Sequence, residues 1–572
     1  MSLSTQGWST LYAPILGLLS GELVMNVSTS PRLIVMPAII ALAWIWLWPF
    51  RPLPLNGFAQ EILAFSAALI VLTLSLLQVQ TIRVAKYVVL FLGLSAIPVL
   101  QSWLGLIPFS GNAWLVSAYL FAFSMMLIAG HSMTLNRASI SKGRAEYFIE
   151  ILAAVFVLAS ALSTWIALRQ YFHLADSIWE VNHNSGRPYA NLGQPNNLAT
   201  LLGLGLAGCL YFYEKQLLGI VAAGVLTFFL LLGLAVTQSR TPWVTSLAIL
   251  AFWLIKMGDF APRLRFPSLC AWMVFYACLV LAIPNLSNLL ELGGPGFLER
   301  AAAGGRWALW QQLWFAVSSG PFWGYGWNQT AAAQVSVTLD WPLAMMATYS
   351  HNLVLDLLLW NGLVPGSLIV ILIAVWLARL GWFANSKESL FALIAAGFIL
   401  THSMFEYPFA YAYFLLPLGL LLGIASADLP EKSHFMLPRI ILLVVVVLGG
   451  GLLKVVTMDY QIIKADYQSQ RMQAAKVIGF ESEVPITDVI FLTQFRELQR
   501  FRAELPESGV SDERLHWMQS VVHQYPHLAN LYRYSLILRL NGQEEDSERY
   551  LTILCHLHGP VFCEQARREM IK

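Results

Sequence analysis

Charged residues are scarce in this sequence, and their scarcity excludes an ordinary soluble protein. Only 12% of the 572 residues are Asp, Glu, Lys or Arg, against about a quarter in soluble domains. Hydrophobic residues make up 58%, and the mean hydropathy is +0.63. The formal net charge of +2 is also too small to indicate nucleic-acid binding. The composition therefore predicts an integral membrane protein.

Motifs that hold nucleotides or metals are missing as well. The chain has no Gly-rich nucleotide loop of the Walker or dinucleotide type, no paired Cys/His spacing for zinc and no Asp-x-Asp motif. We therefore expect no cofactor and no bound metal. A nucleotide sugar held through a metal ion is correspondingly disfavoured as a ligand.

The sequence contains only five cysteines. Cys209, Cys270 and Cys278 lie inside apolar runs and are interpreted as small hydrophobic fillers. Cys555 and Cys563 lie in the polar C-terminal tail. They could pair if that tail is extracytoplasmic, but a free reduced pair is equally consistent with the sequence.

Long apolar runs dominate the rest of the chain. There are thirteen of them, and most have the length of about 17 to 25 residues that a helix needs to cross a bilayer. They cover residues 34–50, 60–78, 85–104, 113–131, 149–170, 195–213, 217–236, 243–256, 267–286, 351–379, 390–405, 409–427 and 438–457. We predict an all-α polytopic membrane protein with about thirteen transmembrane helices. Residues 1–33 are treated as an N-terminal extension of uncertain role.

Lys and Arg gather in alternate loops between these runs. One set of loops carries fourteen of them and the other set only six, so the first set should be cytoplasmic. This orientation divides the chain into membrane helices over 34–286 and 351–457, a large outer loop over 287–350 and an outer tail over 458–572. In a bacterium, the outer side of the inner membrane is the periplasm. The tail loses the long apolar runs, and its helical spacing, with a stop at Gly542, predicts a helical domain.

Four polar clusters fall on the predicted outer face. The first covers residues 186–197 and contains Arg187, Gln194, Asn196 and Asn197 just where a membrane helix begins. A helix N-terminus offers unpaired N–H groups and the positive end of its dipole, which suit an anionic or sugar ligand. A loop with ordinary helix caps is the competing interpretation.

The second cluster contains Arg240, followed by Thr241 and Pro242 as cap and first residue of the next helix. This arginine lies near a positive helix end and in the loops that are poor in basic residues. An anionic ligand would compensate both features. The alternative is a side chain that extends to lipid phosphate.

The third cluster lies in the long loop, where Arg306 follows two glycines and precedes Trp307, Trp310 and Trp314. The spacing of three and four predicts an amphipathic helix that rests on the membrane with its aromatic side down. Arginine suits a diphosphate because its planar fork makes paired charge-assisted bonds. A solvated arginine on a structural helix is the alternative.

The fourth cluster is centred on His351, where the chain re-enters the membrane. A helix N-terminus favours the neutral imidazole, which can accept a proton from a hydroxyl. Asn352 and Asp356 could orient the ring, or Asp356 could be a buried hydrogen-bonded acid. Tyr407, beside Glu406 in a later outer turn, could contact sugar or phosphate, or anchor the chain in the aromatic belt. With arginines as charge stabilisers, these residues favour a lipid-linked diphosphate ligand that approaches from the bilayer.

In these residues the chain resembles the O-antigen ligase and polymerase superfamily, specifically its bacterial O-linked protein oligosaccharyltransferase (PglL-type) branch. The resemblance covers roughly residues 34–460 in layout. The matching motifs are residues 186–197 (GRPYANLGQPNN), Ser239-Arg240, Gly304-Gly305-Arg306, Gly324-Tyr325-Gly326 and Ser350-His351-Asn352. Of these, the NLGQPNN run is the most specific to the branch.

The resemblance implies transfer of an oligosaccharide en bloc from undecaprenyl diphosphate to a Ser or Thr of a periplasmic protein such as a type IV pilin. His351 would then be the base, Arg240 and Arg306 would bind the diphosphate, and Gln194 and Tyr407 would lie at the donor site. A ligase acting on lipid A core and an O-antigen polymerase are the nearest alternatives. A flippase for lipid-linked sugars, which performs no chemistry, is a third, although the polar residues gather at one face instead of at the midplane.

Overall fold

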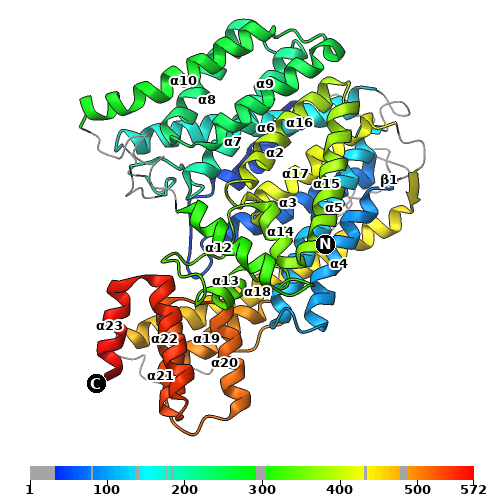
Figure 1. Cartoon of the computed structure of the whole chain (residues 1–572). Helices are drawn as coiled ribbons and strands as arrows, with labels where there is room; N and C mark the ends of the chain where they lie inside the picture. Colours follow the sequence, from blue (N-terminus) through cyan, green and yellow to red (C-terminus); the bar gives the residue numbers. More distant parts are fainter. Residues whose placement is uncertain are drawn as a thin grey trace, which may run out of the picture.

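The computed structural model describes residues 32–78, 82–135, 142–174, 177–181, 186–291, 305–430, 434–476 and 487–571, so most of the N-terminal extension lies outside it. These segments are almost entirely helical (Figure 1). Eight of the described helices are long and apolar enough to cross a membrane, and the shorter apolar segments Val88–Trp103 and Ala412–Asp428 accompany them. The predicted class, a polytopic helical membrane protein, is confirmed.

Each predicted apolar run falls on a helix. The first nine correspond to α2 (Arg32–Leu47), α3 (Phe58–Gln78), α4 (Val88–Trp103), α5 (Ser110–Leu135), α6 (Lys142–Tyr171), α7 (Pro195–Glu214), α8 (Ile220–Thr237), α9 (Thr241–Phe260) and α10 (Phe266–Leu289). The loop region contains α12 (Arg306–Ser319) and α13 (Thr330–Val337). The later runs form α14 (Leu353–Asn361), α15 (Leu363–Phe383), α16 (Lys387–Ser403), α17 (Ala412–Ala425) and α18 (Arg439–Ala474).

The single span predicted over residues 351–379 is wrong, because Gly362 divides it into α14 and α15. Gly362 has φ +84°, a left-handed value that side chains rarely tolerate. A Cβ atom at this position would lie 1.9 Å from the carbonyl oxygen of Phe322. The chain therefore re-enters through a short helix before the long one begins.

The core of the membrane region lies between α5, α6, α7, α16 and α17. Its centre consists of large side chains with no solvent exposure, one from each helix: Leu127, Phe156, Leu201, Ile399 and Leu421. Such packing between helices, and not a difference in hydrophobicity from lipid, holds a membrane bundle together.

In the contacts that follow, each loop touches another loop of the same predicted set, either the set rich in Lys and Arg or the set poor in them. On one face, Lys215 pairs with Glu388 at 3.0 Å, and strand β1 (Ile82–Ala85) pairs antiparallel with β2 (His434–Leu437). On the other face, Arg51 donates to the carbonyl of Asn191 at 2.9 Å. This separation supports the alternation of loops from which the orientation was predicted. The two short strands were not predicted, because each forms only through the other.

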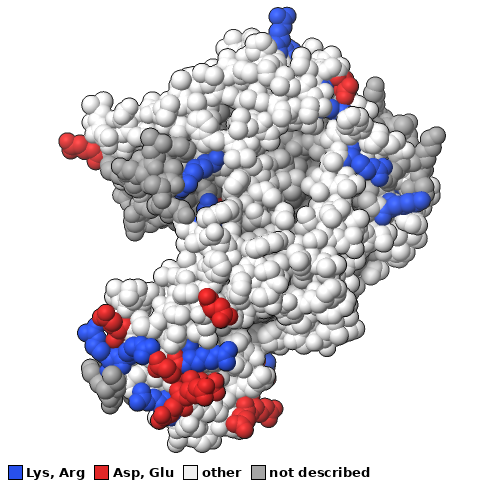
Figure 2. All heavy atoms as spheres, viewed as in Figure 1, with Lys and Arg blue, Asp and Glu red and all other residues white. Residues whose placement is uncertain are grey.

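The tail forms a compact group of helices beyond the membrane region. It comprises α19 (Thr493–Ala503), α20 (Asp512–Gln524), α21 (Leu528–Leu540), α22 (Glu544–His558) and α23 (Pro560–Ile571). As predicted, α21 ends just before Gly542, which has φ +74°. Acidic and basic side chains gather on the visible face of the tail (Figure 2). The expected boundary at residues 457/458 lies inside the continuous helix α18.

The tail packs against the loop region and the end of α5. Phe109 and Val335 belong to the same apolar cluster as the buried side chains of α20 to α22. His556 Nδ1 donates to the carbonyl of Thr338 at 2.9 Å, and Gly111 N donates to Thr493 Oγ1 at 3.0 Å. The tail and the 305–350 segment therefore lie on the same face of the bundle.

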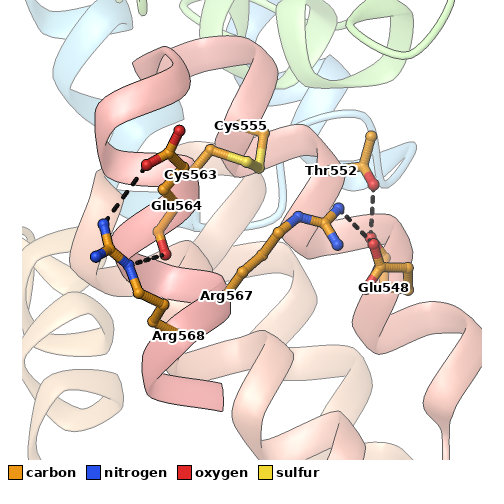
Figure 3. The surroundings of a disulfide bond; sticks show 7 residues. All are labelled: Glu548, Thr552, Cys555, Cys563, Glu564, Arg567 and Arg568. Atoms are coloured by element: carbon orange, nitrogen blue, oxygen red, sulfur yellow. Dashed lines mark hydrogen bonds and ion pairs between the residues drawn. A yellow bond between two sulfur atoms is a disulfide. The ribbon is translucent and has the colours of Figure 1, made fainter. Parts of the chain in front are cut away.

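A disulfide joins Cys555 to Cys563 across the turn between α22 and α23 (Figure 3). The sequence did not distinguish a bonded pair from a reduced pair, and the structure contains the bonded pair. Ion pairs Arg567–Glu548 at 2.5 Å and Arg568–Glu564 at 3.5 Å flank the bond. A disulfide in the tail favours an oxidising compartment.

We predict that the double variant Cys555→Ser/Cys563→Ser destabilises the tail by roughly 2 to 3 kcal/mol, because the bond closes a short loop in the unfolded chain. Hydrogen–deuterium exchange on peptides from α22 and α23 of the full-length protein would measure the loss. Cys270→Ser, which removes a free cysteine of the membrane region, is the matched control. Unchanged exchange in the double variant would show that the disulfide does not stabilise the tail.

Candidate active site

The backbone around His351 is held in an uncommon conformation. His351 has φ +60°, a region that non-glycine residues adopt mainly at constrained sites. Ser350 N, on one side, donates to Asp356 Oδ1 at 2.9 Å. On the other side, the Asn352 side chain caps α14 by accepting from Leu355 N at 3.1 Å. Asn352 and Asp356 therefore orient His351 through its backbone.

The imidazole of His351 contacts a carboxylate that lies in the turn between α16 and α17. Glu406 Oε2 is 2.6 Å from His351 Nδ1, and Arg306 pairs with the other oxygen of the same carboxylate. Glu406 is only 3% exposed. The carboxylate places a proton on Nδ1 and leaves Nε2 as the nitrogen that can accept one.

Burial alone would raise the pKa of Glu406. The hydrogen bond with His351 and the positive charge of Arg306 outweigh burial, so the pKa of Glu406 lies below its ordinary value. Glu406 is therefore ionised near neutral pH. It can hold a proton-accepting histidine and a guanidinium in fixed positions at the same time.

Asn196 connects Glu406 to the loop that carries Arg240. Its Nδ2 donates to Glu406 Oε1 at 2.9 Å, and its Oδ1 accepts from Ser239 Oγ at 2.8 Å. Ser239 immediately precedes Arg240, which is the exposed N-cap residue of α9. One carboxylate, Glu406, and one amide, Asn196, thus link all four of the predicted polar clusters.

Arg187 makes hydrogen bonds to the loop that carries Arg240. Its Nε donates to the carbonyl of Thr237 at 2.9 Å, and its Nη2 lies 3.5 Å from the carbonyl of Gln238. Asn197 is 2% exposed and donates to the hydroxyl of Tyr413 at 3.4 Å. Both residues therefore make contacts within the protein, and a role for either in binding donor or glycan stays a prediction.

Gln194 and Tyr407 do come together beside His351. The Gln194 side chain hydrogen-bonds the Tyr407 hydroxyl. The Tyr407 ring meets the His351 ring edge-on at 5.0 Å and stacks on Tyr349 at 4.8 Å. These side chains form an aromatic and amide wall next to the imidazole.

Helix α12 begins at Arg306, as predicted. It buries Leu309 and Leu313, whereas Trp307 and Trp314 are 67% and 51% exposed. Trp310 turns toward the active site and donates to the carbonyl of Ser350 at 2.8 Å. Exposed tryptophans at the outer face are typical of a helix at a membrane interface.

Four helices begin at this site. Asn196 lies in the first turn of α7, Arg240 caps α9, Arg306 opens α12, and His351 immediately precedes the cap of α14. Each helix N-terminus contributes partial positive charge and unpaired N–H groups. Together with two guanidinium groups, these four N-termini make the site suited to a multiply charged anion.

Sequence reasoning missed Glu406 as a site residue. The available signal was a carboxylate in an outer turn of a chain that has few charged residues. Such acids in membrane proteins usually have a partner. The partner, His351, lies 55 residues away in sequence, so local pattern did not connect them.

Comparisons with known proteins identify the family. Residues 188–212 match the family described as "Protein glycosylation ligase", and residues 225–371 match "O-Antigen ligase". Residues 390–561 match "Virulence factor membrane-bound polymerase, C-terminal". The chain is 32% identical over 539 residues to the "General O-oligosaccharyltransferase" of Acinetobacter baylyi, with 92% of each chain covered. The chain belongs to the O-oligosaccharyltransferase family.

A second Acinetobacter baylyi relative, the "ComP-specific O-oligosaccharyltransferase", is 31% identical over 379 residues, which cover 65% of this chain and 67% of the relative. This oligosaccharyltransferase is therefore an enzyme, a membrane glycosyltransferase, as predicted. Its three matched segments each contribute to the site. They contain Asn196, His351 and Glu406 respectively.

We predict that Glu406→Gln lowers kcat of the oligosaccharyltransferase by about 10²-fold or more, because the imidazolium formed during proton transfer loses its charged partner. The acidic limb of the pH–rate profile should also move to lower pH. Glu388→Gln, which alters another buried acid paired to Lys215 on the opposite face, should leave the profile unchanged. A Glu406→Gln enzyme with an unaltered rate and profile would contradict this role.

Proposed function

We propose that this oligosaccharyltransferase moves a glycan en bloc from undecaprenyl diphosphate to a Ser or Thr hydroxyl of a periplasmic protein such as a type IV pilin. The observation that carries the proposal is the contact of one buried carboxylate, Glu406, with both His351 and Arg306. Through Glu406, the proposed proton acceptor His351 lies beside the proposed anion-binding group Arg306. Such an arrangement fits displacement of a diphosphate by a hydroxyl.

In the proposed reaction, His351 Nε2 takes the proton of the acceptor hydroxyl. The hydroxyl oxygen forms a bond to the anomeric carbon of the first sugar, and the bond from that carbon to the diphosphate oxygen breaks. The electron pair leaves with undecaprenyl diphosphate, whose charge Arg240 and Arg306 stabilise. Glu406 stabilises the imidazolium, and Gln194 and Tyr407 contact the donor.

Asn196 contributes by position. Its amide fixes the distance between Glu406 and the loop of Arg240 through two hydrogen bonds. Preorganised donors around a developing charge are usually the largest source of rate enhancement. The proposed chemistry assigns no step to a metal ion.

The proposed location is the bacterial inner membrane, with the active site and the tail in the periplasm. The excess of Lys and Arg in the other set of loops supports this orientation. The Cys555–Cys563 disulfide in the tail supports it independently. Undecaprenyl-linked oligosaccharide, the acceptor protein and membrane lipids are the proposed partners.

We predict that purified enzyme glycosylates a pilin when given undecaprenyl-diphosphate oligosaccharide, and that His351→Ala lowers the rate by about 10²- to 10⁴-fold. Lipid A core, offered separately, should remain unmodified. His434→Ala, a histidine of the opposite face, is the control and should retain full activity. Mass spectrometry of the pilin would count the transferred glycans.

Other outcomes would identify the alternatives. Modified lipid A core would make the protein a ligase, and elongated lipid-linked glycan would make it a polymerase. The matches to the ligase and polymerase families make both assays informative. Full activity of His351→Ala would refute the proposed base.

A further inference from the structure

A large apolar cavity lies apart from the active site, between α7, α8, α9, α10 and α16. Its volume is about 500 Å³, and its walls are mostly apolar, with Leu210, Ala223, Leu231 and Leu269 among them. No residue assigned to the active site lines it. A cavity of this size and polarity accommodates hydrocarbon better than water. We refer to it as the α8–α10 cavity.

Only one end of the α8–α10 cavity is charged. Arg263 and Arg265 are its only charged lining residues, and both lie in the connection between α9 and α10. Helix α9 starts beside Arg240 and has 20 residues, a length of about 30 Å. The two arginines therefore lie at the membrane face opposite to the active site.

The two arginines differ in their contacts within the protein. Arg263 lies over the Tyr213 ring at 4.4 Å and donates to the Tyr213 carbonyl at 3.2 Å. The Arg263 residue as a whole is exposed. Arg265 is exposed at the N-cap of α10, and Ser268 lines the cavity one turn further on. This end combines two positive charges with the positive end of the α10 helix dipole.

The position of Arg263 and Arg265 distinguishes between two lipids that could occupy the cavity, the lipid-linked donor and a phospholipid. In the proposed function the donor places its diphosphate on Arg240 and Arg306, at the other face, so its hydrocarbon chain would leave Arg263 and Arg265 without an anion. We propose instead that the α8–α10 cavity binds an acyl chain of an anionic phospholipid from the opposite leaflet, with Arg263 and Arg265 on its phosphate. The choice of a phospholipid over the donor rests on the proposed function, whereas the apolar walls and the two arginines do not depend on the reaction.

The bound lipid would brace the helix that carries Arg240. Ser246 and Ile249 of α9 line the cavity. Tyr276 of α10 also lines it, and its ring lies 5.4 Å from Trp243 in the first turn of α9. A ligand that binds only the folded state stabilises the protein by mass action.

Gly224 offers a way to fill the cavity without disturbing the backbone. It lies in α8 and lines the cavity, and a Cβ atom built on it meets no atom within 4 Å. Gly224→Leu should therefore occupy lipid space while the helix is retained. The matched control is Gly258→Leu on α9. A Cβ atom at Gly258 also meets no atom within 4 Å, but this residue does not line the cavity. Lys86→Gln, an exposed cation outside the cavity on the same membrane face as Arg263 and Arg265, is the control for charge.

The test is native mass spectrometry of the full-length protein with phosphatidylglycerol, phosphatidylcholine of the same acyl chains, or undecaprenyl phosphate. We expect wild type to retain phosphatidylglycerol in preference to phosphatidylcholine. Arg263→Gln and Arg265→Gln should each weaken its retention about fivefold, and Gly224→Leu should abolish the preference. Both controls should behave as wild type, and the unfolding temperature of lipid-free Gly224→Leu should match that of Gly258→Leu.

Two results would overturn the proposal. Equal retention of the two phospholipids, or retention of phosphatidylglycerol that Gly224→Leu leaves intact, would indicate lipid bound only to the outer surface. Undecaprenyl phosphate that displaces phosphatidylglycerol from wild type, and whose own retention Gly224→Leu abolishes, would assign the cavity to the donor. Neither result would change the expected loss of glycan transfer in His351→Ala, so the two proposals fail separately.

Discussion

One buried carboxylate sets the geometry of the face that carries the active site. Glu406 meets His351, Arg306 and Asn196 at once, and these partners come from the starts of three different helices. Removing an ion from water is costly unless its partners compensate, so the three contacts are mutually dependent. Movement of any one helix start would leave a charge unpaired in a poorly hydrated place. Glu406 thereby holds side chains from separate loops together in one site.

The bilayer explains how much of this fold the sequence predicted. Backbone polar groups have no water partner inside lipid, so apolar runs of sufficient length must be helices, and each of the thirteen runs is helical. Hydropathy does not reveal that an apolar run is divided into two helices. Gly362 divides α14 from α15 because the Phe322 carbonyl approaches it closely, and that approach exists only in the folded chain.

The same distinction holds for the active site. His351, Arg240 and Arg306 could be predicted because charged or titratable groups at the membrane surface need a reason to be there. Their relation to each other could not, since Glu406 and Asn196 are 210 residues apart in sequence. Arg187 and Asn197 carried the same local signal as their neighbours, yet they support the backbone and the packing. Residue type indicates capacity for a role, and only the tertiary contacts assign it.

Helix α18 is a single shaft of 36 residues that passes from the membrane region into the tail. At 1.5 Å per residue it is about 54 Å long, well beyond the roughly 30 Å of a bilayer core. It contains three consecutive glycines, Gly449, Gly450 and Gly451, each about 1 kcal/mol less favourable than alanine in a helix. Gly449 faces Leu69 of α3, whereas a Cβ at the next two glycines would meet no atom within 4 Å. Gly449 lies ten residues, about 15 Å, from the start of α18, so the three glycines fall within the roughly 30 Å that crosses the bilayer core. The helix is therefore weakest in local propensity inside the lipid, where no water competes for its backbone hydrogen bonds.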